Sequence, residues 1–78
     1  MNAALNAAVT VFKSLKKTRG LCYSVVGRNK IRFNNLDKDY MEMVHFAAQD
    51  IAAKGFRCEL DYHLGNNGFS GLLKVTRS

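Results

Sequence analysis

The side chains that could catalyse a reaction are few, and their spacing keeps them apart. Cys58 and His63 have the residue types of a thiolate–imidazole pair, but they are five residues apart in a segment that alternates like a β-strand. Side chains an odd number of positions apart point to opposite faces of a strand. Asp61 and His63 share a face, yet no serine or cysteine of that strand face lies beside them to be activated. We therefore expect a binding protein rather than an enzyme.

Metal and cofactor sites are not indicated either. Cys22 and Cys58 are 36 residues apart, and His45 and His63 lie on different expected elements. Structural zinc sites usually contain closely spaced ligand pairs, which this pattern lacks. The sequence has neither a Walker A loop nor a Gly-x-Gly-x-x-Gly fingerprint for phosphate groups. We expect no metal and no cofactor.

The cysteine count and the first residues of the chain bear on its compartment. Two cysteines are too few for the disulfide framework of a small secreted domain, so we expect both thiols to be free. The first positive side chain is Lys13, so the chain starts without the charged region of a signal peptide. No apolar run approaches the roughly 18 residues of a membrane span. These features favour a cytoplasmic location and no membrane partner.

Charge is the feature that points most directly to a partner. The 78 residues carry 12 Lys+Arg against 6 Asp+Glu, a formal net charge of +6. All the acids fall between Asp37 and Asp61, and residues 1–36 contain none. The basic residues of that first part are Lys13, Lys16, Lys17, Arg19, Arg28, Lys30 and Arg32. Such a segment favours sequence-independent contacts with an RNA or DNA backbone, or with a complex that handles nucleic acid.

The first two elements must position these basic residues. Apolar residues recur with helical spacing over residues 3–17, at Leu5, Ala8, Val9, Phe12 and Leu15, and Gly20 lies just beyond. Residues 21–34 predict a β-hairpin that turns at Gly27-Arg28-Asn29. The basic residues therefore form two groups, one where the helix ends and one at the hairpin. We expect the two groups to straddle one phosphate backbone.

The register of this hairpin depends on the length of its loop. A three-residue loop pairs Val25 with Ile31 and Tyr23 with Phe33, and it places both pairs on the buried face. A two-residue loop would instead set Ser24 against Phe33 and bury Cys22. We prefer the first register, because only it gives an all-apolar inner face.

The second half of the chain predicts a helix and a longer hairpin. Asp37 is a natural N-cap for a helix over residues 38–54, whose core stripe is Tyr40, Val44, Ala47 and Ile51. Residues 56–64 alternate strictly, and a turn at Asn66-Asn67 pairs Leu64 with Phe69, Tyr62 with Gly71, Leu60 with Leu73 and Cys58 with Val75. Every one of these pairs is apolar or glycine, so we expect them to face inward, with Leu60 and Leu73 as buried neighbours. Gly65-Asn66-Asn67-Gly68 has the Gly-x-x-Gly spacing of KH RNA-binding domains, but strands rather than helices flank it.

These elements predict one α+β domain over residues 1–78, with the order α-β-β-α-β-β. Two hairpins would form a four-stranded antiparallel sheet in a two-layer sandwich, with both helices on one face and water on the other. In this arrangement Tyr23, Phe33, Tyr62 and Phe69 all point into the core. No aromatic platform would then remain on the sheet for stacking nucleobases.

A second hypothesis is a protein partner. Phe46 lies off the core stripe of the second helix and is surrounded by Asp39, Glu42 and Asp50, the composition of a small hot spot with a polar rim. Either the first helix packs over Phe46 and Met43, or it packs on the opposite flank and leaves Phe46 free. If Phe46 is free, the protein would suit an adaptor or a small accessory inhibitor. Leu72, outward-facing on an edge or near-edge strand, is a second candidate contact for a homodimer.

Overall fold

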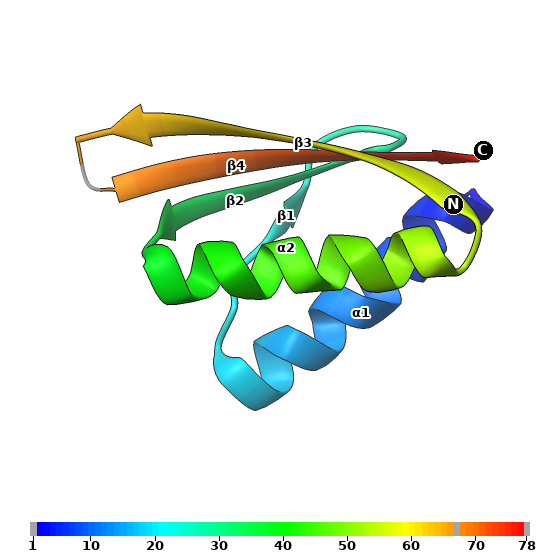
Figure 1. Cartoon of the computed structure of the whole chain (residues 1–78), viewed down its shortest axis with the longest axis horizontal. Coiled ribbons are helices and arrows are strands. Elements are labelled where there is room, and N and C mark those ends of the chain that lie inside the picture. Colours follow the sequence, from blue (N-terminus) through cyan, green and yellow to red (C-terminus); the bar gives the residue numbers. More distant parts are fainter. Residues whose placement is uncertain (1, 67, 78) are drawn as a thin grey trace.

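Both helices lie on one face of a four-stranded antiparallel sheet (Figure 1). The structure is a computed structural model that describes residues 2–66 and 68–77. Its elements are α1 (Ala3–Arg19), β1 (Ser24–Val25), β2 (Lys30–Leu36), α2 (Lys38–Ala53), β3 (Phe56–Gly65) and β4 (Gly68–Arg77). The α+β class and the α-β-β-α-β-β order expected from the sequence are confirmed.

Each helix begins and ends at residues that satisfy its free backbone groups. The side chain of Asn2 accepts a hydrogen bond from the amide of Leu5 at 2.7 Å, and Asp37 accepts one from the amide of Tyr40 at 2.9 Å. Gly20 ends α1 in the left-handed conformation, with φ of 75°, and its N–H bonds to carbonyls of the last turn. α1 therefore runs two residues beyond the expected 3–17, whereas α2 ends at Ala53 with Lys54 as its cap.

The strand order is β1-β2-β4-β3, so β4 lies inside the sheet and β3 forms one edge. Within the C-terminal hairpin the predicted register is confirmed from Cys58–Val75 to Leu64–Phe69. The predicted turn at Asn66-Asn67 falls partly outside the described residues, but strands flank it on both sides. β4 lies next to the edge strand β3, so Leu72 is on a near-edge strand and faces outward as expected, where it is half-buried between Arg32 and Asp61.

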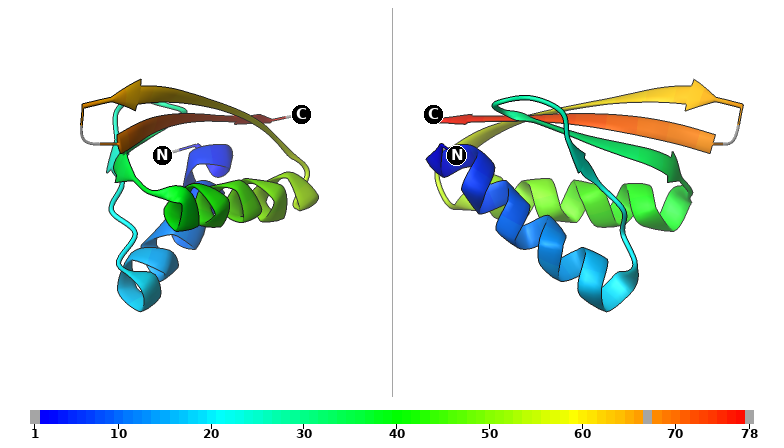
Figure 2. Two further views of the ribbon diagram at one scale, coloured as in Figure 1. Left: turned by 60° about the vertical axis from the view of Figure 1, so that its left-hand side comes forward. Right: turned by 180° about the vertical axis from the view of Figure 1, so that it is seen from behind.

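The first hairpin has the preferred register but a shorter strand than expected. Val25 pairs with Ile31, and Cys22 is exposed as that register requires. The expectation that Val25 is buried is wrong, because its side chain is 47% exposed. The reason is that α1 packs mainly against β4 and α2 against β3, so the two-residue edge strand β1 extends past the helix layer (Figure 2).

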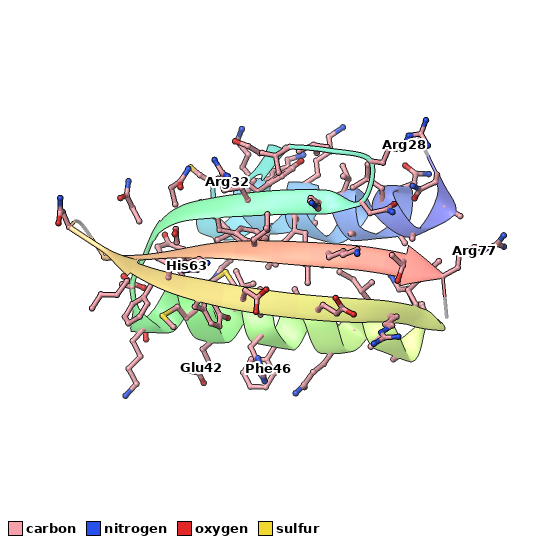
Figure 3. All side chains as sticks on the ribbon, turned by 90° about the horizontal axis from the view of Figure 1, so that it is seen from above. Arg28, Arg32, Glu42, Phe46, His63 and Arg77 are labelled. Carbon is pink, nitrogen blue, oxygen red and sulfur yellow. The ribbon has the colours of Figure 1, made fainter. Side chains whose placement is uncertain are left out.

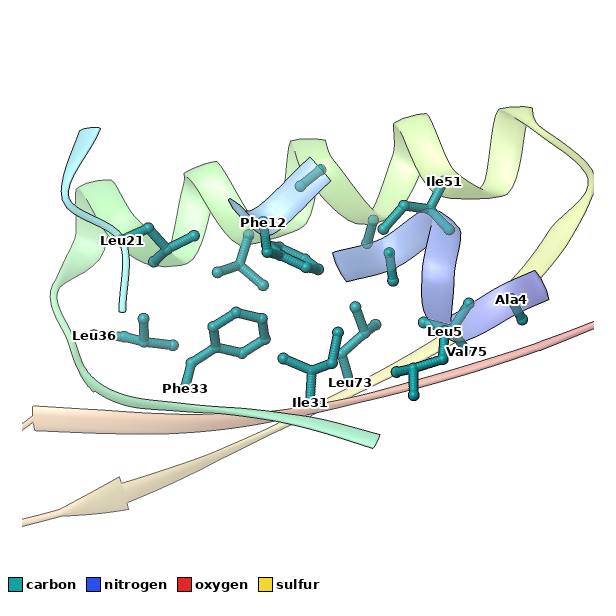
Figure 4. Packing of buried hydrophobic residues seen from close by; sticks show 14 residues of the cluster. Ala4, Leu5, Phe12, Leu21, Ile31, Phe33, Leu36, Ile51, Leu73 and Val75 are labelled. Atoms are coloured by element: carbon teal, nitrogen blue, oxygen red, sulfur yellow. The ribbon is translucent and has the colours of Figure 1, made fainter. Parts of the chain in front are cut away.

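The core fills the space between the sheet and the two helices (Figure 4). Phe12 from α1 and Phe33 from β2 are both fully buried, and their rings meet edge-to-face with centroids 4.9 Å apart. An irregularity in β2, with Asn35 in the left-handed region at φ 56°, lets Phe33 and Leu36 both face the core. Tyr23, Tyr62 and Phe69 pack against this core, so the sheet face carries none of the four aromatics named above.

The two cysteines should differ in their reactivity. Both are free, as expected; Cys22 is exposed, whereas Cys58 is half-buried and burial raises the pKa of its thiol. Because the thiolate is the reactive form, a thiol reagent at mildly alkaline pH should modify Cys22 first and Cys58 several-fold more slowly. A Cys22→Ser variant should retain only the slow phase, and denaturant should make the two rates similar. Equal rates in the native protein would contradict the placement of Cys58.

Candidate functional site

The basic residues of the first 36 positions lie in two separate places. Lys13, Lys16, Lys17 and Arg19 occupy the C-terminal half of α1, which runs away from the sheet (Figure 2). The tip of the first hairpin lies at the other end of the helix, where the side-chain amide of Asn2 donates a hydrogen bond to the carbonyl of Arg28 at 3.1 Å. A helix of 17 residues is about 25 Å long. The helix end and the hairpin tip therefore do not come together as expected.

A different basic cluster forms on the sheet. Lys30 on β2 pairs directly with Lys74 on β4, on the face that the helices leave uncovered, and Arg32 follows on the same face of β2. Arg28 lies at one end of this face (Figure 3). Arg77 lies near the same end, but it pairs with Phe56 and belongs to the opposite, helix-side face of β4. All four side chains of the cluster are exposed. We call this cluster the basic sheet face: Arg28, Lys30, Arg32 and Lys74.

Lys74 is the residue of this cluster that sequence reasoning missed. It is far from the first hairpin in the chain and joins it only because β4 pairs with β2. The alternation of β4 places Lys74 outward, but nothing in the sequence shows which strand lies beside it. The strand order decides which residue lies beside Lys74, and the sequence does not reveal that order.

The charges on the basic sheet face oppose one another. Like charges directly opposite across two strands are destabilising, and Lys30 and Lys74 are such a pair. Glu59 lies on the other side of Lys74, but its carboxylate pairs with Arg57 at 3.2 Å. In residues 2–66 and 68–77, that is the one ion pair formed, so none of the four cations has a bonded acid there.

The strand pairing also places a serine where none was expected. Ser70 lies opposite His63, and Asp61 is on the same face of β3. Ser70 was missed because only the strand that contains His63 was taken into account. No hydrogen bond joins these three side chains within the described part of the chain.

A groove of about 740 Å³ lies between α1 and α2. Its apolar lining comes from Val11 and Leu15 of α1 and from Met43, Phe46 and Ala47 of α2. Phe46 is 57% exposed, whereas Met43 is half-buried against the core. α1 packs on the flank of α2 that carries Met43 and Phe46, since residues of both helices line one groove there, yet it leaves Phe46 exposed. The structure therefore combines the two expected arrangements: the flank is that of the first, and the free Phe46 is that of the second.

The acidic residues named with Phe46 line the same groove. Asp39, Glu42 and Asp50 lie along one side of α2, and all three are exposed. Glu42 and Phe46 project from α2 past the edge of the sheet, away from Arg28 and Arg32 (Figure 3). The α1 wall was missed by the sequence argument, because Leu15 was assigned to the core and Val11 to no site.

Metal ligands, membrane spans and known relatives give no further indication of function. No group of three or more His, Cys, Asp and Glu side chains in the described ranges could hold a metal ion. Within those ranges neither helix is both long and apolar enough to cross a lipid bilayer. Comparison with protein-family models, curated proteins and solved structures finds no match. We therefore infer function from the geometry of the chain itself.

Proposed function

We propose that the protein is a non-enzymatic binding protein whose basic sheet face contacts the phosphate backbone of RNA or DNA, either free or within a nucleoprotein complex. The observation that supports this most directly is the pair of Lys30 and Lys74. Two exposed lysines directly opposite each other lower the stability of the sheet. A bound polyanion would relieve that repulsion, since each phosphate adds a negative charge near the two ammonium groups.

The basic residues of α1 can be explained without a bound nucleic acid. Lys16, Lys17 and Arg19 lie in the last turn of the helix, where cations interact favourably with the helix dipole. Folding alone can therefore account for them. The like-charged pair on the sheet disfavours folding, so a functional reason is needed there rather than on α1.

The expected binding mode is independent of base sequence. The aromatic side chains of the strands pack in or against the core, which leaves the basic sheet face without rings for base stacking. Exposed lysine and arginine on a sheet surface neutralise phosphates and position the backbone. The proposal includes a cytoplasmic site of action, where the free thiols of Cys22 and Cys58 stay reduced.

Salt-dependent binding tests this proposal. Labelled duplex DNA, duplex RNA and single-stranded RNA are titrated with the protein at several salt concentrations, with anisotropy as the readout. The log–log slope should be about −0.9 per duplex phosphate contacted, or about −0.7 on single strands. Lys30→Gln and Lys74→Gln should each weaken binding to every sequence and reduce the duplex slope by about one unit.

The lysines of α1 provide the control, because they lie apart from the basic sheet face. Lys13→Gln and Lys17→Gln make the same charge change on α1, and they should leave the slope nearly unchanged. Failure to bind any nucleic acid at low salt would refute the proposal. A larger loss from the α1 variants than from the sheet variants would place the contact on the helix instead.

A further inference from the structure

We propose that the groove between α1 and α2 binds an amphipathic helix with a basic polar face, supplied by another protein. This proposal does not depend on the basic sheet face. The groove lies on the helix layer, and its residues differ entirely from those that would contact phosphates.

The lining of the groove fits the apolar side of a helix. Val11, Leu15 and Met43 are half-buried at its base, and Phe46 stands exposed at its margin. A third helix laid against two others buries apolar side chains at i, i+3, i+4 and i+7 in such a groove. An exposed aromatic residue beside a small apolar cleft is the usual anchor of a binding hot spot.

The rim of the groove selects the charge of the occupant. Asp39, Glu42 and Asp50 place three carboxylates along the α2 side, against the single cation Arg19 among the lining residues. Electrostatic complementarity therefore favours lysine and arginine on the polar face of the bound helix. The same carboxylates repel phosphates, so a nucleic acid is disfavoured at this site.

The charge also disfavours a second copy of the chain. A two-fold dimer through this groove would set the carboxylates of one copy against the same carboxylates of the other. The basic helix α1 of a second copy could supply lysines, but its large apolar side chains Leu5 and Phe12 are already buried in its own core. A separate protein with free apolar positions fits better.

A designed peptide tests the groove. The probe is a labelled helix of about 16 residues, about 24 Å long and matched to α2, with leucines at helical spacing and lysines elsewhere. A second probe replaces every lysine by glutamate. The lysine peptide should bind the full chain and the glutamate peptide should not. Absence of lysine-peptide binding at the highest soluble concentration would overturn the proposal.

Matched variants locate the binding site. Phe46→Ala should weaken lysine-peptide binding at least about tenfold, as expected for truncation of a hot-spot residue. Leu64→Ala should leave it unchanged, because Leu64 is 74% exposed but lies on the distant hairpin. Glu42→Gln should also weaken binding, whereas Asp61→Asn on the sheet should not. Equal effects of site and control variants would overturn the proposal.

Three further readouts separate lost binding from lost folding and from other occupants of the groove. Phe46 is exposed, so Phe46→Ala should melt near the wild-type temperature, which separates lost binding from lost folding. Sedimentation should show the same oligomeric state with and without the substitution, and nucleic-acid binding should be unaffected. A dimer that dissociates on Phe46→Ala would assign the groove to a second copy and overturn the proposal.

Discussion

Leu73→Ala is expected to lower the free energy of unfolding by about 2–5 kcal/mol, the usual cost of a cavity at a fully buried leucine. Leu73 is 0% exposed on the internal strand β4, where residues of both neighbouring strands and the helix layer surround it. A loss of that size is a large share of the about 5–15 kcal/mol that stabilises most native proteins. In a domain of this length it should lower Tm by about 4–8 °C per kcal/mol.

Leu60→Ala is the matched comparison for this prediction. Leu60 pairs directly with Leu73 across β3 and β4, so both substitutions remove the same atoms from the same face. The sequence predicts that both leucines are buried, but Leu60 is only half-buried because β3 is an edge strand. Its truncation should therefore cost distinctly less than that of Leu73. Equal losses by chemical denaturation would contradict the internal position of β4.

This pair of leucines also shows what the sequence could predict. Alternation and turn residues determine the register of a hairpin, because both act between residues close in the chain. The register of Leu60 with Leu73 was predictable for that reason, as were the caps at Asp37 and Gly20. The order of the strands depends on how two hairpins approach each other. No local pattern reports that approach, so the unequal burial of the two leucines could not be predicted.

The candidate sites show the same difference between what local sequence patterns predict and what depends on packing. Asp39, Glu42, Phe46 and Asp50 were predictable as a group, because helical spacing alone places them on one side of α2. The α1 wall of the groove depends on how the helices pack, so Val11 and Leu15 were missed. Lys74 is the corresponding case on the sheet, since its neighbour Lys30 lies on a strand that is distant in the sequence.

Lys30→Glu is expected to weaken nucleic-acid binding strongly while slightly stabilising the fold. The substitution removes one positive charge and adds one negative charge, a change of two units on the basic sheet face. At about 50 mM salt the one lost phosphate contact corresponds to about tenfold in affinity, and the new carboxylate also repels the backbone, so the total loss should exceed about tenfold. The duplex salt slope should fall by at least about one unit, measured with the same labelled duplexes.

The stability of the same variant tests why Lys30 is a lysine. The carboxylate introduced by Lys30→Glu would face Lys74 as an opposite charge, so the free energy of unfolding should rise by about 0.2–1 kcal/mol. The double variant Lys30→Glu, Lys74→Glu would restore like charges across the strands and add a third carboxylate beside Glu59, so this gain should disappear. If Lys30→Glu destabilised the protein, the two lysines would not repel each other in the folded state. Their pairing would then give no reason to place a polyanion on the sheet.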